Sequence, residues 1–196
     1  MPSKKNDRIF VIDTSLFVNP QCRIHFGKTP SLAVSAFVKL VRSLNKKHNM
    51  KIFMPPAIFS ELKNFLDKKS IDSLELIVIL KSPSLHELKL PAAIFHDFIE
   101  DLRSRVNKGL RLAEDFAKDN APDNDAKLKK LREKYKEAMR SGILDSKEDL
   151  ELVLLAKELD AVLITGDEGA MKFARDLGCS FSSASKFHSL LNSMKK

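Results

Sequence analysis

The sequence has only two cysteines and lacks any long uncharged hydrophobic run. Cys22 and Cys179 are too few for a disulfide framework and match no metal-binding spacing, which indicates a reducing compartment. The segment from Met1 to Arg8 is polar and charged, and nowhere do about 18 apolar residues follow one another, so the sequence predicts neither a signal peptide nor a membrane span. We therefore expect a cytoplasmic protein without a membrane partner.

Length and composition fit one domain, or one domain that carries an insertion. The 196 residues are 43% hydrophobic, which is enough for a sizeable core. The net charge of +8 and the pI near 9.4 suit a polyanionic partner, although a basic balance alone describes only solubility and non-specific attraction. Residues 127–140 contain seven Lys or Arg and two Glu, so more than half of the net charge lies in this segment.

Residues 91–141 have the pattern of an inserted helical hairpin. Pro91 opens a long helical repeat, residues 119–125 are rich in turn formers, and a second helix with a thin apolar stripe follows. We expect the second helix to lie on the surface or protrude, and the apolar row of the first helix to lie inside. That row comprises Ile94, Phe95, Phe98, Ile99, Leu102, Val106, Leu110, Ala113 and Phe116.

The basic residues of this hairpin are candidates for contact with the phosphates of a nucleic acid. A charge run is usually a solvated face, but one-sided charge beside a second basic row favours phosphate contact. On the second helix, three- and four-residue spacing places the basic residues in one stripe. The candidates are Arg103, Arg105, Lys108 and Arg111 on the first helix, and Lys129, Arg132, Lys136 and Arg140 on the second.

Aspartates stand at the ends of two predicted strands and at the start of one helix. Asp13 follows an apolar run at residues 9–12, and Asp167 follows a second run at residues 161–164, as in buried parallel strands. Asp145 and Asp149 are four residues apart at the start of the helix predicted over 146–159. Because clustered carboxylates repel one another, the set predicts a divalent metal site at the carboxyl edge of the sheet.

Each acidic position also has a structural explanation. Asp13 before Thr and Ser fits a helix cap, and Asp145 fits the N-cap of a capping box. Glu61, on a helix opened by Pro55 and Pro56, fits the metal site or an exposed helical position about equally. Further strands are predicted at residues 51–54, near residue 80 and at residues 179–181, which gives an α/β fold with a mostly parallel central sheet.

This order of elements resembles the PIN domain of metal-dependent nucleases, a three-layer α/β fold. Five segments further resemble the HARP family, the small protein-only ribonuclease P enzymes of some bacteria and archaea, whose archaeal members have also been labelled RNA ligase partner proteins. The segments are residues 10–20, 53–55, 105–111, 131–135 and 142–149. One position departs from the family pattern, since Lys136 stands where a second Arg is often found and offers a point charge instead of a bidentate fork.

The resemblance implies endonucleolytic removal of the 5′ leader from precursor tRNA without an RNA subunit. It places the catalytic, metal-binding carboxylates at Asp13, Asp145, Asp149 and Asp167, with Glu61 as an additional candidate. Such a set suits one or two Mg²⁺ or Mn²⁺ ions and a product with a 5′-phosphate, while Thr14, Ser15 and Thr165 would donate hydrogen bonds to the carboxylates. It also implies that the hairpin grips the tRNA body and that dimers assemble into a larger homo-oligomer, with a dodecamer as one candidate size.

Three alternatives use part of the same pattern. A PIN toxin that cuts RNA would need the same carboxylates, but such toxins are usually shorter and lack a long basic hairpin. A non-catalytic RNA-binding partner would keep the basic stripe without needing all four Asp. A haloacid-dehalogenase-type phosphatase also begins with a strand and Asp, yet Asp13 has no second Asp two residues further on.

Overall fold

The chain folds into two compact units, described here from a computed structural model. The first unit comprises residues 1–89 and 147–196, and the second comprises residues 90–146, which include the predicted insertion. The structure describes residues 7–119, 123–140 and 146–195. No helix in these ranges is both long enough and apolar enough to cross a membrane.

The first unit is built on a five-stranded, entirely parallel sheet, which confirms the predicted α/β class. The strand order is β3-β2-β1-β4-β5. Phe10, Val11 and Ile12 of β1 are all buried, as expected for the central strand of a parallel sheet with both faces covered. The strands are β1 (Asp7–Ile12), β2 (Asn49–Met54), β3 (Val78–Leu80), β4 (Val162–Thr165) and β5 (Phe181–Ser183).

The order of the strands reverses direction between β1 and β4. The chain passes from β1 to β2 and β3 on one side, whereas β4 pairs with the other side of β1 and leads on to β5. The backbone N–H of Asp13 donates to the carbonyl of Ile164 at 3.1 Å, so the ends of these two strands are held side by side. A crevice at such a reversal is where open α/β sheets bind ligands.

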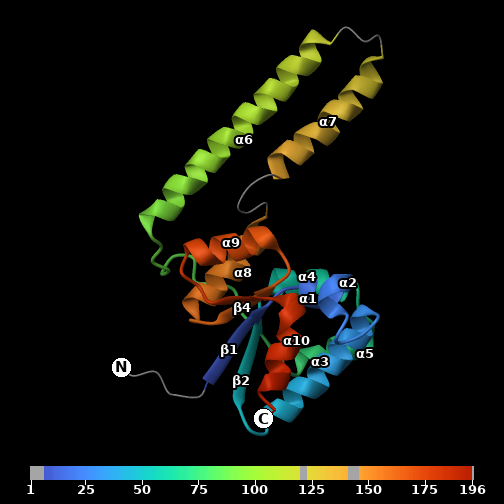
Figure 1. Cartoon of the computed structure of the whole chain (residues 1–196), viewed down its shortest axis with the longest axis vertical. Helices are drawn as coiled ribbons and strands as arrows, with labels where there is room; N and C mark the ends of the chain where they lie inside the picture. The colour runs from blue at the N-terminus through green and yellow to red at the C-terminus, as the bar shows by residue number, and fades with distance from the viewer. Residues whose placement is uncertain (1–6, 120–122, 141–145, 196) are drawn as a thin grey trace. The chain divides into compact units, whose positions relative to one another are not determined.

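Helices cover the sheet of the first unit (Figure 1). Helices α3 and α10 contact each other, while α8 and α9 contact each other and β4. Five consecutive residues of α8, Leu152 to Ala156, are buried, so this part of the helix is apolar all round and packs within the unit. The helices are α1 (Ser15–Val18), α2 (Pro20–Arg23), α3 (Pro30–Leu44), α4 (Pro56–Lys63), α5 (Lys68–Glu75), α8 (Lys147–Glu158), α9 (Glu168–Asp176) and α10 (Ala184–Ser193).

Glu158, the last residue of α8, holds the segment that follows β3. Its Oε1 accepts a hydrogen bond from Lys81 Nζ at 2.6 Å, and its Oε2 accepts one from the backbone N–H of Ser84 at 2.6 Å. The hydrogen bond from Lys81, and after it the one from Ser84, lowers the pKa of Glu158. The chain is therefore fixed to α8 shortly before the second unit begins.

The second unit is a pair of helices, α6 (Ala92–Lys118) and α7 (Asn124–Arg140). They pack closely at Gly109, where a Cβ atom would lie only 2.6 Å from Cε2 of Tyr135. Arg105 strengthens the contact, since its guanidinium lies 2.7 Å from the carboxylate of Asp101 and donates to the carbonyl of Met139 at 3.2 Å. The two helices are thus held together by the close packing of Gly109 against Tyr135 and by the hydrogen bond from Arg105 to Met139.

Two predictions about α6 are wrong. The apolar row expected inside is largely exposed, because α7 is much shorter than α6 and has only a narrow apolar stripe to offer it. Phe95 is 67% exposed, for example, and only Ile94 and Phe116 of the row are half-buried. Arg105 was predicted to contact phosphates with the other basic residues, which requires an exposed side chain, but its side chain is only 13% exposed because it bridges α6 and α7.

Candidate active site

Asp13 lies at the reversal point of the sheet, directly after β1. It is 6% exposed, and no ion pair to a basic side chain in the described part of the chain offsets its burial, which is unusual for a carboxylate. The register pairs Ile12 with Ile164, so Asp13 is adjacent to Thr165, the last residue of β4. Two strands that are 150 residues apart in sequence therefore place their terminal polar groups together.

Three hydroxyl groups donate hydrogen bonds to the carboxylate of Asp13. Oδ2 accepts from Ser15 Oγ at 2.6 Å and from Thr165 Oγ1 at 2.8 Å, while Oδ1 accepts a longer bond from Thr14 Oγ1 at 3.3 Å. These are the three residues that the sequence suggested as supporting donors. One carboxylate oxygen is thus held firmly, and the other is held weakly.

Backbone groups fix the direction of the two short hydroxyl bonds. Ser15 Oγ accepts from the N–H of Gly166 at 2.8 Å, and Thr165 Oγ1 accepts from the N–H of Asp167 at 3.0 Å. Because each hydroxyl oxygen already accepts a backbone proton, its own single proton points to Oδ2 of Asp13. The arrangement fixes the carboxylate and leaves Oδ1 as the oxygen suited to a cation.

The other described carboxylates have different surroundings. Asp167 is exposed and caps α9, since its Oδ1 accepts from the N–H of Ala170 at 2.7 Å. Asp149 is half-buried in the first turn of α8, a helix that contacts both β1 and β4. Glu61 is exposed on α4, which contacts α8. Capping leaves Asp167 with its second oxygen for another role.

The fourth predicted carboxylate, Asp145, lies outside the described residues. Within the described ranges, no three His, Cys, Asp or Glu side chains are grouped closely enough to hold a metal ion. The predicted ligand set therefore remains a prediction. The structure brings Asp13 together with Thr14, Ser15 and Thr165.

Sequence reasoning missed Gly166 and Cys22. A Cβ atom on Gly166 would lie 2.9 Å from Sγ of Cys22 and 3.2 Å from Oγ of Ser15, so only glycine fits there without displacing its neighbours. Burial, and after it the charge of Asp13, raises the pKa of the Cys22 thiol. The glycine between Thr165 and Asp167 was visible in the sequence, but its contact with α2 depends on tertiary packing.

Comparison with known proteins identifies the family. The model of the PINc domain ribonuclease family matches residues 9–196. A protein of Pyrococcus abyssi named RNA-free ribonuclease P is 42% identical over 189 residues, which cover 94% of this chain and 92% of the relative. This chain is a PINc-domain ribonuclease of the RNA-free ribonuclease P family. The predicted family, α/β PIN-like fold and endoribonuclease class are thereby confirmed.

Other comparisons extend the range of relatives. A protein of Thermodesulfovibrio yellowstonii with the same name is 41% identical over 189 residues and covers 95% of each chain. Among solved structures, a PilT N-terminus domain protein from Sulfolobus solfataricus P2 aligns with 95% of this chain and 92% of its own, at 16% identity and a TM-score of 0.41. The likeness to this solved structure is too weak to support an argument.

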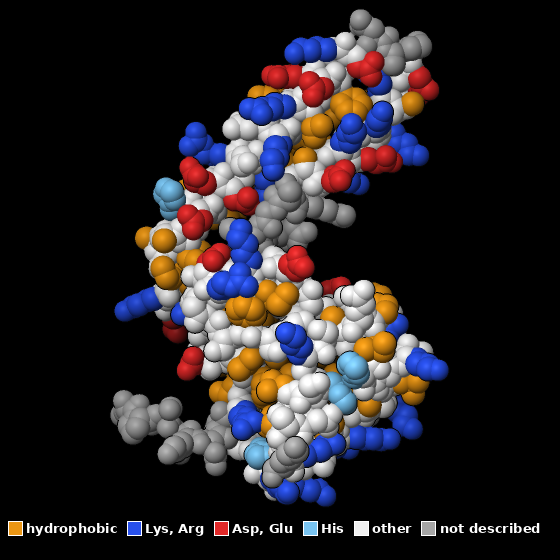
Figure 2. Space-filling model, in the orientation of Figure 1, with side chains coloured by type: hydrophobic (Ala, Val, Ile, Leu, Met, Phe, Trp, Pro, Cys, Tyr) orange, Lys and Arg blue, Asp and Glu red, His pale blue; other side chains and the backbone are white. Residues whose placement is uncertain are grey.

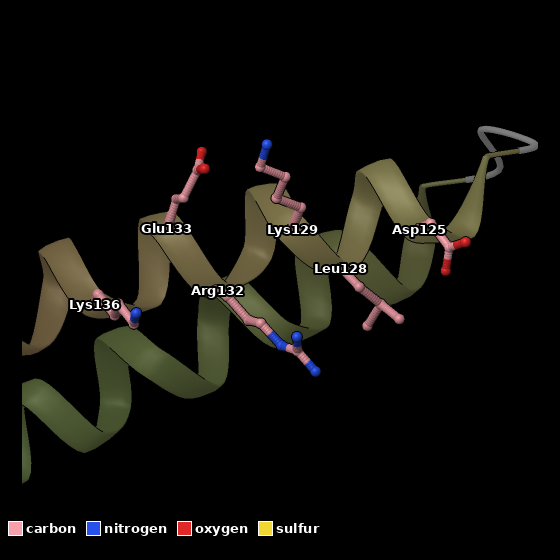
Figure 3. A pocket seen from close by; sticks show the side chains of 6 residues that line it. All are labelled: Asp125, Leu128, Lys129, Arg132, Glu133 and Lys136. Atoms are coloured by element: carbon pink, nitrogen blue, oxygen red, sulfur yellow. The ribbon is translucent and has the colours of Figure 1, made fainter.

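In this PINc-domain ribonuclease, the predicted basic stripe of α7 borders a shallow hollow of about 370 Å³. Lys129, Arg132 and Lys136 line it, while nothing is described of the side chain of Arg140. Figure 3 shows the side chains of Lys129 and Glu133 pointing to one side of α7 and that of Arg132 pointing to the other. Asp125 and Glu133 also line the hollow, so its charge is less one-sided than the count for residues 127–140 suggests.

Proposed function

We propose that this PINc-domain ribonuclease removes the 5′ leader of precursor tRNA without an RNA subunit and leaves a 5′-phosphate on the mature tRNA. The observation that carries the proposal is the fixed carboxylate of Asp13 at the reversal point of the sheet. The name of the relatives, RNA-free ribonuclease P, supports the substrate and the absence of an RNA subunit.

The donor set suits a divalent cation of the Mg²⁺ type. Nucleases of the PIN family in general depend on a divalent metal. Mg²⁺ and Mn²⁺ prefer carboxylate oxygens and water, and Asp13 Oδ1 with Asp149 would hold one ion without any His or Cys. Asp145 and Asp167 would hold a second ion or orient water. When bound, such ions acidify a water molecule and offset the charge of the phosphodiester.

The protein's own groups have a positioning role in this proposal. Ser15 and Thr165 keep Asp13 in one orientation before substrate arrives, so little reorganisation is needed during the reaction. Glu61 lies on α4, next to α8, and is the additional candidate ligand. No side chain needs to form a covalent bond with the RNA.

The proposal is tested by cleavage of a 5′-labelled precursor tRNA, with the cut mapped to the nucleotide. We expect a cut at the mature 5′ end in the presence of Mg²⁺ or Mn²⁺ and none in EDTA. Restoring Mg²⁺ after EDTA should restore the cut, which separates metal dependence from unfolding. A cut at other positions would instead indicate a toxin-type endoribonuclease, and tight tRNA binding without any cut would indicate a non-catalytic partner.

The basic residues of the hairpin would grip the tRNA body in this scheme. The set is Arg103, Lys108, Arg111, Lys129, Arg132, Lys136 and Arg140; Arg105 is left out because it joins the two helices. Replacing Arg132 by Ala should weaken tRNA binding and lower the slope of log affinity against log salt by about 1. Lys130, exposed on α7 but not lining the hollow, provides the matched control as Lys130→Ala. Equal effects of both substitutions would contradict a specific stripe.

The exposed apolar row of α6 supports self-association into dimers and larger homo-oligomers. Phe95, Phe98, Ile99 and Leu102 lie in the first half of the helix, and each is more than two-fifths exposed. A row of this kind is typical of a protein interface. Light scattering at micromolar concentration measures the assembly, and a strict monomer that still processes tRNA would contradict it.

A further inference from the structure

Two stretches of the sequence contain no acidic residue at all. Residues 14–60 include seven Lys or Arg and no Asp or Glu, and residues 177–196 include three Lys and no Asp or Glu. These stretches together exceed the whole net charge of +8. By contrast, the second unit, residues 90–146, has twelve basic and eleven acidic residues. Most of the positive excess therefore belongs to the first unit and not to the hairpin.

The two acid-free stretches meet in space where α10 packs against α2 and α3. A groove of about 350 Å³ lies between α3 and α10, with Phe26 beyond the end of α2 also lining it, and it is large enough for a small organic ligand (pockets of about 300–1,000 Å³). Figure 2 shows Lys, Arg and His side chains gathered at the lower end of the first unit without Asp or Glu between them. The lining that matters here is Phe26, Lys39, Ser43, His188, Asn192 and Lys195.

Flat rings stand at this groove. Phe26 and His188 line it, with perpendicular rings whose centroids are 4.9 Å apart. His25, which does not line the groove, is stacked on His188 with ring centroids 5.7 Å apart and an angle of 18° between the planes. His25 is exposed, so the outer face of the stack is open to a further planar group. Burial, together with the nearby charges of His25 and Lys195, lowers the pKa of His188. Lys39 and Lys195 supply exposed ammonium groups beside these rings.

Helix α10, which forms one wall of the groove, begins at the edge of the sheet that bears Asp13. Cys22 of α2 would touch any Cβ atom on Gly166, and His25 follows it by three residues. Helix α10 starts directly after Ser183, which pairs with Thr165 in the sheet. His188 lies in the middle of α10 and Lys195 just beyond its end, so the groove follows the second half of α10, away from the edge that bears Asp13.

We propose that this α3–α10 groove binds the single-stranded 5′ leader of the RNA substrate, with a base stacked on His25 and backbone phosphates beside Lys39 and Lys195. Basic grooves with aromatic platforms bind single strands in this way, because every base has a flat face and every linkage a charge. The proposal rests on the proposed function for the identity of the strand. It concerns RNA outside the tRNA body, which the hairpin is proposed to hold.

Binding of a fluorescein-labelled ten-nucleotide single-stranded RNA, measured by anisotropy at several salt concentrations, tests the groove without any cleavage. Lys39→Ala combined with Lys195→Ala should weaken binding roughly tenfold and lower the salt slope by about 1.4, since each phosphate contact contributes about 0.7 on single strands. Lys46→Ala with Lys47→Ala is the matched control, because both lysines are exposed in the same acid-free stretch but do not line the groove. Equal weakening by both pairs would overturn the proposal.

A second measurement separates the groove from the proposed function. Precursor tRNAs with leaders of one and eight nucleotides are compared, and wild-type kcat/KM should be roughly tenfold higher for the long leader. The ratio should fall to near one in the Lys39/Lys195 variant and in His25→Ala. Equal cleavage of both leaders by the wild type would overturn the groove proposal. Absence of any cleavage would overturn the proposed function alone. In that case, single-stranded RNA that carries 4-thiouridine would be crosslinked to the protein. Crosslinks at His25 would support the groove, and crosslinks at α6 and α7 would overturn it.

Discussion

Asp13→Asn is expected to lower the cleavage rate on precursor tRNA by roughly 10³-fold or more while the fold is retained. The carboxylate has donors on one side and, in the proposed mechanism, a cation on the other. An amide cannot satisfy both, because one of its two terminal groups is an NH₂ donor. Either the NH₂ group faces the hydroxyls of Ser15 and Thr165, or it faces the cation. Both orientations remove the interaction that the site requires.

The control for this substitution is Asp72→Asn, which removes the same charge from an exposed position on α5. It should leave the rate unchanged. Thermal unfolding of both variants shows whether Asp13→Asn has merely destabilised the core around β1. A folded Asp13→Asn protein that cleaves within tenfold of the wild-type rate would show that Asp13 is not a catalytic ligand.

The local sequence pattern was sufficient to predict the parallel sheet and the position of Asp13 at its edge. An apolar run followed by Asp predicts a buried strand with a carboxylate beyond its end. Asp13 follows β1 directly, and Asp167 follows β4 after Gly166. The hydroxyls of Ser15 and Thr165 were also identifiable, since they are adjacent in sequence to the strand ends. What the sequence could not show is which oxygen of Asp13 they hold.

Periodicity was misleading where the partner of a helix face was in question. The apolar row on α6 has helical spacing, which establishes that its members share one face but not what covers that face. In the second unit α7 is too short and too polar to cover it, and Phe95 and Leu110 are therefore exposed. Arg105 illustrates the converse, since a basic residue counted as solvated lies instead between the two helices.

Composition was misleading in a similar way. The cluster at residues 127–140 drew attention because its basic residues are closely spaced, whereas those of the acid-free stretches at 14–60 and 177–196 are scattered along the chain. Basic side chains of the two stretches, such as Lys39 and Lys195, come together only when α3 and α10 pack against each other. A long-range contact is thus needed before the second basic surface exists.

Gly166→Ala is expected to lower kcat by about 10- to 100-fold with little change in KM, the size of effect that follows loss of a group supporting a metal ligand. The added methyl group would lie 2.9 Å from Sγ of Cys22 and 3.3 Å from Cβ of Ser15. Relief of that crowding has to move the backbone of Gly166 or the side chain of Ser15. Either movement stretches the 2.8 Å bond from Gly166 N–H to Ser15 Oγ, and the hydroxyl then loses its fixed direction toward Asp13.

Two further variants show whether the effect acts through this contact. Cys22→Ala removes the nearest clashing atom, so the double variant should regain part of the lost kcat, and the two substitutions should be non-additive. Gly178→Ala is the glycine control, because its φ of +67° makes alanine strained while no atom lies within 4 Å of the new methyl group. It should lower the thermal midpoint without lowering kcat. If Gly166→Ala instead kept the wild-type kcat, the hydrogen bonds from Gly166 through Ser15 to Asp13 would have no part in catalysis. If both glycine variants lost kcat equally, the loss would be a general effect of lower stability.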